Sequence, residues 1–246
     1  MKPVISFRNV TKSYPLYGSF TSGIKNFLFH LPTAIKEARC GQFQALSDIS
    51  FDIHSGETVG FIGSNGAGKS SILSLIAGVI QPTTGEIEVN GRVSPLLELG
   101  AGFHFELTGR DNILLNGVLL GLTKAQVLAK MDQIIDYSEI GQFIDQPIRS
   151  YSSGMLARLG FSVVAHLEPE ILLLDEMLAV GDASFQKKCL RKMMEFREDN
   201  VTMVFVSHSM DDVLRICTRV LWIKDHAIFL DGSPGEVVSA YLSQNS

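Results

Sequence analysis

The sequence has little of what marks secreted, membrane-spanning or nucleic-acid-binding proteins. Its 246 residues include three cysteines, an odd number without metal-ligand spacing, which predicts reduced, buried thiols in the cytoplasm. The longest apolar stretches, such as Ile113 to Leu122, extend for about ten residues, far short of a bilayer-spanning helix. The N-terminus also lacks the charged and apolar segments of an export signal. We therefore expect a soluble protein, although a partner can still hold it at a membrane.

A block of basic residues is missing as well. The chain has 21 lysines and arginines against 26 aspartates and glutamates, which gives a net charge of −5. A nucleic-acid-binding domain usually carries a basic stripe, so we expect no nucleic-acid partner. Internal repeats and low-complexity tracts are also missing, while 46% of the residues are hydrophobic. This composition predicts a folded globular protein with a substantial core.

The clearest motif is a glycine-rich turn between an apolar run and a segment with helical spacing. It fits the pattern G-x-x-x-x-G-K-[ST], and the loop consists of Gly63, Ser64, Asn65, Gly66, Ala67, Gly68, Lys69, Ser70 and Ser71. Glycines let the backbone curl so that successive N–H groups point at phosphate oxygens, and the next helix directs its positive end there. Lys69 can reach the β- and γ-phosphates, and Ser70 can bind Mg²⁺. The motif predicts a nucleoside triphosphate site rather than a plain glycine turn.

Two further apolar runs end in residues that can do chemistry. Ile171 to Leu174 is typical of a buried parallel strand, and Asp175 and Glu176 follow at its carboxyl end. Asp175 can hold the hydration shell of Mg²⁺, and Glu176 can polarise an attacking water. Val201 to Val206 ends near His208, whose ring would lie beside the γ-phosphate if the two strands are parallel. The alternatives are a solvated acidic strand end and a structural histidine.

A third motif, Tyr-Ser-Ser-Gly-Met at Tyr151 to Met155, precedes a predicted helix. Ser152 or Ser153 would cap this helix, and Gly154 adds to a small-residue N-terminus that can bind an anion. The alternative is a plain helix cap. If the motif belongs to a separate helical lobe, it cannot serve the phosphates of the glycine loop. Its anion would then come from another subunit.

Hydrophobic periodicity predicts an α/β protein with a helical insertion. We expect strands at residues 4–10, 49–53, 59–62, 85–90, 171–174, 201–206, 220–223 and 227–230, and helices at 110–120, 124–137, 155–167 and 234–242. Residues 11–14 are expected to turn away from the first strand. The chain, 1–246, is expected to be a single domain with a core (1–95 and 168–246), a helical subdomain (about 100–167) and an insertion (15–45).

The insertion carries a helical stripe formed by Phe20, Ile24, Phe27, Leu28 and Leu31. One interpretation is a helix that folds back on its own domain. The other is a docking face for a partner or a membrane surface. The sequence leaves both open.

The order of these motifs closely resembles that of the nucleotide-binding subunit of ABC transporters, over essentially the whole chain. The resemblance implies a P-loop NTPase core of ABC type with an antiparallel β subdomain and an inserted α-helical subdomain. It also implies ATPase activity with ATP and Mg²⁺, adenine stacked on Tyr14, and a dimer-crossing loop at Val180 to Asp182. In a homodimer of this kind, two copies close head to tail around two ATP molecules. Each site combines Lys69 of one copy with the signature motif, Ser152 to Met155, of the other.

Within the family, three segments resemble the branch that exports bacterial cell-surface polysaccharides, above all the O-antigen exporters. These segments are Leu97 to Phe103, Leu107 to Asn112 and Gly232 to Val238. The resemblance implies two copies of an integral-membrane permease, a lipid-linked polysaccharide as cargo, and a position at the cytoplasmic face of the bacterial inner membrane. Teichoic acid and capsule are the alternative cargoes. Because the chain ends at Ser246, we expect no additional glycan-binding domain.

Two positions depart from the family pattern. Glu98 stands where the family has glutamine, and a carboxylate there can hold Mg²⁺ through water but also repels the γ-phosphate. Ser153 replaces a glycine of the signature motif, which predicts slower turnover. The rival classes are a soluble, non-transport ABC switch and a phosphate-loop kinase of another family. The switch would show paired domains, coiled-coil insertions or basic patches, and the kinase would not need the capped helix or His208.

Overall fold

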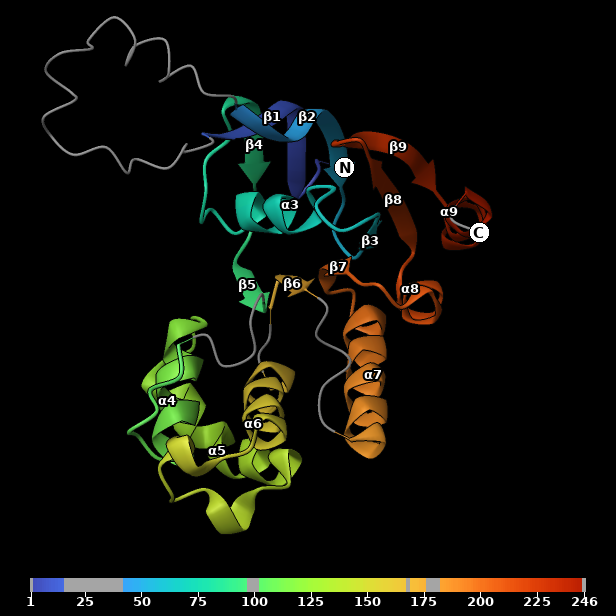
Figure 1. Ribbon diagram of the computed structural model, residues 1–246. Helices are drawn as coiled ribbons and strands as arrows, with labels where there is room; N and C mark the ends of the chain where they lie inside the picture. The colour runs from blue at the N-terminus through green and yellow to red at the C-terminus, as the bar shows by residue number, and fades with distance from the viewer. Residues whose placement is uncertain (1, 16–41, 97–101, 167–168, 176–181, 245–246) are drawn as a thin grey trace, which may run out of the picture.

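The computed structural model describes residues 2–15, 42–96, 102–166, 169–175 and 182–244. Figure 1 shows two sheets and helix α3 (Lys69–Ile76) in one lobe, and a group of helices in a second lobe below β5 and β6. Helix α7 (Ala183–Glu198) extends from the first lobe toward the level of the second.

The larger sheet has the strand order β5-β6-β7-β3-β8-β9. Its strands are β3 (Thr58–Ile62), β5 (Val93–Leu96), β6 (Ile171–Asp175), β7 (Thr202–Val206), β8 (Arg219–Lys224) and β9 (Ala227–Gly232). Neighbouring strands are parallel except β8 and β9, which form an antiparallel hairpin. The carboxyl ends of β3, β6 and β7 therefore lie at the same edge, where ligands bind in sheets of this type.

Both faces of this sheet are covered, which explains why its central strands are apolar at consecutive positions. Along β6, Leu172 and Leu174 pack into one hydrophobic core, whereas Ile171 and Leu173 pack into a second core that includes α3 residues. All four side chains are at most 1% exposed. Burial on both faces therefore fixes the position of β6 up to its last residue, Asp175.

The smaller sheet is antiparallel, with the order β2-β1-β4. Its strands are β1 (Ile5–Pro15), β2 (Gln42–Ile53) and β4 (Thr84–Val89). The expectation that residues 11–14 turn away was wrong, because β1 continues and Tyr14 pairs with Phe43. Residues 42–44 are all exposed, so the start of β2 lacks the alternation that predicts a strand. The rest of the predicted insertion, residues 16–41, lies outside the described residues.

The second lobe contains α4 (Gly109–Leu119), α5 (Lys124–Ser138) and α6 (Ser153–Ala165), with 3-10 turns η1 (Gly141–Phe143) and η2 (Ile148–Ser150) between α5 and α6. The predicted helices at 110–120, 124–137 and 155–167 agree with these elements as far as the chain is described. Each helix begins with a hydroxyl cap. Thr108, Thr123 and Ser152 accept a hydrogen bond from the backbone N–H three residues later.

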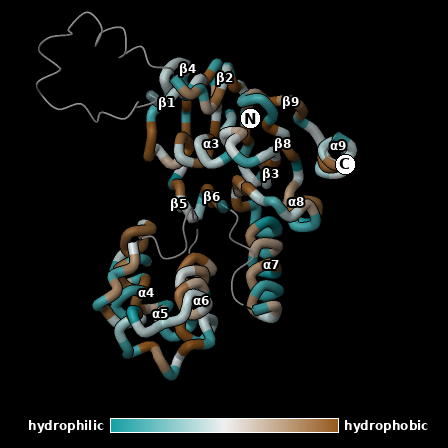
Figure 2. Tube along the Cα trace, in the orientation of Figure 1, coloured by the Kyte–Doolittle hydropathy of each residue, from teal (hydrophilic) through white to brown (hydrophobic). Residues whose placement is uncertain are grey.

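Helices α7 and α8 (Met210–Ile216) were not predicted, whereas the closing helix α9 (Pro234–Gln244) was. The buried side chains of α7 are Phe185, Cys189, Met193 and Phe196, a narrow stripe in a charged segment. Figure 2 shows this as teal and brown segments that alternate along α7. Across the described part of the chain, we find no helix that is both long and apolar enough to cross a membrane.

Two of the three cysteines can be placed, and both are free and buried as predicted. Burial raises the pKa of the Cys189 thiol and of the Cys217 thiol to about 12. Both thiols are therefore protonated and unreactive at neutral pH. Cys40 lies outside the described residues.

Candidate functional site

The loop after β3 is curled by glycines and held by its own lysine. Gly63, Gly66 and Gly68 have φ angles of 149°, 79° and 108°, in the region that favours glycine. Nζ of Lys69 donates hydrogen bonds to the carbonyl oxygens of Gly63 (2.8 Å) and Ser64 (3.0 Å). Gly68 is the N-cap of α3 and offers no side chain to the first N–H groups of that helix. The loop therefore combines a lysine ammonium with a helix N-terminus that an anion can occupy.

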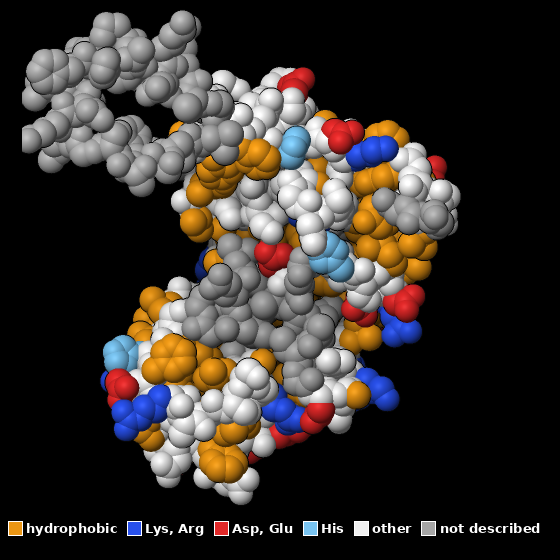
Figure 3. Space-filling model, viewed as in Figure 1, with side chains coloured by type: hydrophobic (Ala, Val, Ile, Leu, Met, Phe, Trp, Pro, Cys, Tyr) orange, Lys and Arg blue, Asp and Glu red, His pale blue; other side chains and the backbone are white. Residues whose placement is uncertain are grey.

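A cavity of about 320 Å³ lies beside this loop. Its lining residues are Tyr14, Phe43, Ala45, Asn65, Gly66, Gly68, Lys69, Ser70 and Ser71. Tyr14 of β1 thus lines the same cavity as the glycine loop, although the sequence separates them by about fifty residues. In Figure 3, hydrophobic side chains gather on the face over β4 and α3. The cavity joins an aromatic wall to a phosphate-binding loop, which fits a nucleotide.

Phe43 was missed by sequence reasoning. It lies in the part of β2 that the hydrophobic pattern did not mark as strand, and its side chain is 43% exposed. The available signal was an aromatic residue just before the predicted strand at 49–53. Only the pairing of Phe43 with Tyr14 in the β1–β2 ladder places it at the cavity.

The strands that lead into the predicted catalytic and metal-binding residues have their carboxyl ends at one edge of the larger sheet. Asp175 ends β6 and is the register partner of Val206, after which Ser207 and His208 leave β7. Strand β7 lies between β6 and β3, so the edge that carries Asp175 also carries the start of the glycine loop. His208 is exposed at this edge. Glu176, like the predicted metal ligand Glu98, lies outside the described residues.

The donors near this edge suit a magnesium ion that is shared with a nucleotide. Ser70 supplies a hydroxyl in the first turn of α3, and Asp175 supplies a carboxylate. Magnesium prefers oxygen ligands and usually takes one or two from protein, with waters and substrate phosphates completing the octahedron. In the described parts of the chain, no group of three or more histidine, cysteine or acidic residues could hold a metal alone.

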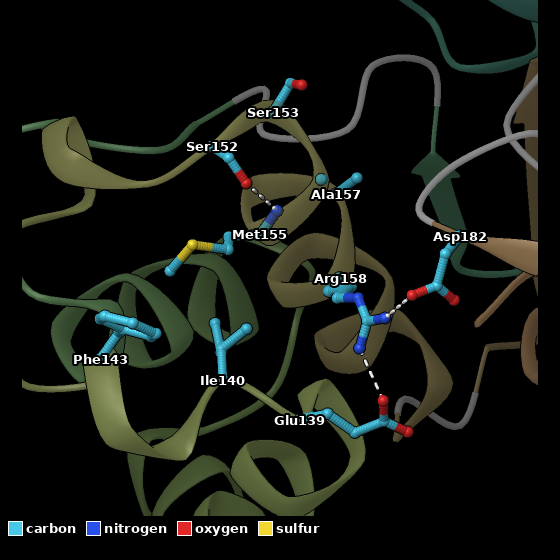
Figure 4. Close-up of a pocket in the computed structure, with 10 residues that line it drawn as sticks. Glu139, Ile140, Phe143, Ser152, Ser153, Met155, Ala157, Arg158 and Asp182 are labelled. Carbon is cyan, nitrogen blue, oxygen red and sulfur yellow. Dashed lines mark hydrogen bonds and ion pairs between the residues drawn. The ribbon is translucent and has the colours of Figure 1, made fainter. Parts of the chain in front are cut away.

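The signature motif lines a different cavity, of about 550 Å³, between α5, α6 and the start of α7. Figure 4 shows Ser152 directed at the backbone of Met155, whose N–H donates to Oγ of Ser152 at 3.2 Å. Ser153 points away from this bond and is exposed. The helix cap that sequence analysis offered as the plain alternative is therefore present. None of the residues that line this cavity lines the cavity of the glycine loop.

Arg158 connects the helical lobe to α7 at the floor of the signature cavity. Its guanidinium donates to Glu139 and to Asp182, each at 2.6 Å, as the dashed lines in Figure 4 mark. Asp182 also caps α7 by accepting from the N–H groups of Ser184 and Phe185. Asp182 was predicted from the sequence, whereas Arg158 and Glu139 were not, because an ion pair between different helices leaves no local pattern. Val180 and Gly181 lie outside the described residues.

These contacts shift the pKa of both carboxyl groups in the same direction. Hydrogen bonds from Lys188 and Arg158 lower the pKa of Glu139 below its ordinary value. The backbone N–H of Phe185 and the charge of Arg158 lower the pKa of Asp182. Both carboxylates are therefore charged at neutral pH, and the two ion pairs are complete.

The family model and the relatives found by comparison with known proteins agree with one another. A family model described as "ABC transporter" matches residues 46–179. The chain is 54% identical over 241 residues to the O-antigen export system ATP-binding protein RfbB of Klebsiella pneumoniae, covering 98% of each chain. It is 44% identical to the teichoic acids export ATP-binding protein TagH of Listeria monocytogenes, covering 96% of this chain and 69% of that protein.

Solved structures share the fold at low sequence identity. The dimeric, ADP- and phosphate-bound ATP-binding cassette MJ0796 superposes with a TM-score of 0.74 at 18% identity, covering 94% of this chain and 98% of the other. An ATP-binding subunit of an ABC transporter gives a TM-score of 0.75 at 18% identity, covering 97% and 93%.

Proposed function

This chain belongs to the ABC transporter family and has its ATPase fold, and on that premise we propose that it hydrolyses ATP to export a lipid-linked cell-surface polysaccharide of the O-antigen type. The observation that carries the proposal is the 54% identity over 98% of both chains with a protein named for O-antigen export. The matched region spans 98% of this chain and therefore extends over the polysaccharide-branch segments at Leu107 to Asn112 and Gly232 to Val238.

Within one copy, each residue at the carboxyl edge of the larger sheet has a separate role in ATP binding or hydrolysis. Lys69 binds the β- and γ-phosphates, and Ser70 and Asp175 hold Mg²⁺. Magnesium supplies charge neutralisation at the phosphates. Glu176 orients and polarises the attacking water, while His208 contacts the γ-phosphate. The shared edge of β3, β6 and β7 supports this assignment because it brings the ends of three separate segments to one edge of the sheet.

Two copies complete the sites. The signature residues line a cavity apart from the glycine loop, which supports a site whose signature motif comes from a second chain. A two-fold homodimer meets this requirement, with the Asp182 loops at the dimer interface. ATP binding closes the dimer and hydrolysis opens it. The helical subdomain, about residues 100–167 as proposed from the sequence, passes this motion to two copies of a permease at the cytoplasmic face of the inner membrane.

The decisive experiment is a gene deletion in the native host, followed by complementation. Deletion is expected to remove O-antigen from the cell surface and to leave lipid-linked polysaccharide inside the cell. Wild-type chain restores export, and Lys69→Ala does not, because the phosphates lose their main cation. Surface polysaccharide is measured by immunoblot and the lipid-linked pool by mass spectrometry. Unchanged surface and internal polysaccharide after deletion would refute the transport assignment.

Teichoic acid is the second candidate cargo, favoured by the 44% identity with the Listeria protein over 96% of this chain. The same deletion strain separates the two. Loss of a phosphate-rich wall polymer with intact O-antigen would select teichoic acid.

A further inference from the structure

Two aromatic residues, one from each strand of the β1–β2 pair, line the nucleotide cavity. Tyr14 and Phe43 are direct register partners in the antiparallel β1–β2 pair. Directly opposite side chains in such a pair lie on the same face, with Cβ atoms about 4.5–5.5 Å apart. Both line the cavity that Lys69 and Ser70 also line. A ligand whose phosphates reach Lys69 therefore meets two rings, and not Tyr14 alone.

Each ring is supported from outside the cavity. Nζ of Lys12 lies 5.0 Å from the centroid of the Tyr14 ring and donates to the carbonyl oxygen of Gln81 at 2.7 Å. This cation occupies one face of the Tyr14 ring, so a planar ligand must stack on the opposite face.

Phe43 is supported by a residue from the β8–β9 hairpin. The ring of His226 meets it edge to face, with centroids 5.5 Å apart and an interplanar angle of 87°. His226 is itself fixed to β2, because Nδ1 lies 3.2 Å from the carbonyl oxygen of Ala45 and its own carbonyl accepts from the N–H of Ser47 at 2.8 Å. The histidine thus limits the orientations that Phe43 can adopt.

We propose that Phe43 is a second base-stacking residue of the nucleotide site and that His226 is the positioning residue that holds its ring. The inference rests on the proposed ATP site and adds to it the surface that recognises the base. A single exposed phenylalanine needs no explanation by itself. This one borders a cavity that already contains a phosphate-binding loop and a second aromatic ring. Phe43 is 43% exposed, and stacking of a purine on its ring would cover part of that exposed surface.

The test compares a ligand that has a base with one that has none. The affinities of the full 246-residue chain for MgATP and for magnesium tripolyphosphate are measured by calorimetry. Phe43→Ala is expected to weaken MgATP about tenfold and to change tripolyphosphate less than about twofold, because only the base contacts the ring. Phe43→Tyr keeps the ring and is expected to restore MgATP affinity. Phe229→Ala is the matched control, since Phe229 is also a strand residue, is 50% exposed and does not line this cavity.

A second variant tests the positioning role. His226 has a φ of 66°, so His226→Asn keeps a residue that tolerates this conformation but removes the ring contact with Phe43. MgATP affinity is expected to fall about threefold with tripolyphosphate unchanged, and no further loss is expected when the change is added to Phe43→Ala. Additive losses in the double variant would overturn the role of His226.

The outcomes separate this inference from the proposed function. Unchanged MgATP affinity in Phe43→Ala would overturn the second stacking residue and leave the ATP site intact. Equal weakening of MgATP and tripolyphosphate would also overturn it, because Phe43 would then act on the loop and not on the base. A wild-type chain that binds neither ligand would remove the nucleotide site itself, and both assignments with it.

Discussion

Gly66 and Gly68 differ in what surrounds them, although both have positive φ angles within one motif. A Cβ on Gly68 would press on the carbonyl oxygen of Ala45 and lie 2.6 Å from Cδ2 of Leu46, whereas a Cβ on Gly66 would find no atom within 4 Å. Gly66→Ala should therefore cost only the left-handed strain, about 1 kcal/mol of unfolding free energy. Gly68→Ala must also displace β2, and we expect a loss of roughly 3 kcal/mol or more.

Urea denaturation of the two alanine variants measures this difference. MgATP binding is expected to be lost in Gly68→Ala, because moving β2 also moves Phe43 and Ala45 at the cavity. Equal destabilisation by the two substitutions would contradict the close approach of β2 to Gly68.

The spacing of the motif predicted which residues form the phosphate loop. It did not predict that the surroundings of Gly66 and Gly68 differ. The motif contains both glycines, yet the atoms that crowd Gly68 belong to Ala45 and Leu46, more than twenty positions away in the chain. Phe43 was missed for the same reason. Its role depends on a cross-strand partner and on a histidine from a distant hairpin, and neither leaves a local pattern.

Secondary-structure elements whose apolar residues recur at a regular spacing were predicted well. Elements without such a spacing were not. The buried strands β6 and β7 and helices α4 to α6 lie where hydrophobic spacing placed them. The start of β2 is exposed and the end of β1 is only partly buried, and the two segments are held by pairing with each other. Helix α7 buries only four side chains in sixteen positions, so its many charged residues make the helical spacing of the apolar ones hard to recognise.

Helices α5, α6 and α7 are joined by a charged network that should make the chain less stable in acid. Because the folded-state pKa values of Glu139 and Asp182 are lowered, their contribution is present above the ordinary carboxyl pKa. It is lost as the pH falls through the lowered values. Arg158→Gln removes the shared donor, so the pKa of Glu139 should rise toward its ordinary value. NMR titration of the carboxyl carbons measures this change.

Stability against pH gives a second measurement of the same network. The Arg158→Gln variant should lose less unfolding free energy than wild type between neutral pH and pH 3. The difference that we expect from Glu139 is below about 1 kcal/mol, since that side chain is 48% exposed and solvent screens the pair. Arg149→Gln is the matched control because Arg149 and Glu106 form a pair with both side chains more than 60% exposed. An unchanged acid profile in Arg158→Gln would show that the network is only a surface contact.

For the whole molecule, the order of the motifs along the sequence predicted the family and the fold. Only the structure shows that the glycine loop and the signature motif line two separate cavities. Each motif is short and local, so its chemistry can be read from spacing alone. Whether two motifs meet depends on topology. The strand order brings Asp175 and the glycine loop to one edge, while the signature motif begins a helix in the other lobe. This separation is the physical reason to expect that one copy of the chain is incomplete.

Mixing two inactive variants tests that expectation. Lys69→Ala disables the phosphate loop. Gly154→Asp places a carboxylate at the signature motif, where a Cβ has room because its nearest neighbour is Oγ of Ser152 at 3.8 Å. Each variant alone should hydrolyse almost no ATP, since every site in its homodimer contains the defect. In a mixed dimer, one site combines the intact loop of one chain with the intact signature motif of the other.

An equimolar mixture should therefore recover about a quarter of wild-type ATPase activity, because half of the dimers are mixed and each has one intact site of two. A mixture of Lys69→Ala with wild-type chain is the control. Activity of about half of wild type shows that a single intact site suffices. If the control gives that value and the two variants together remain inactive, the loop and the signature motif do not act across the dimer, and hydrolysis by this chain must be explained within a single copy.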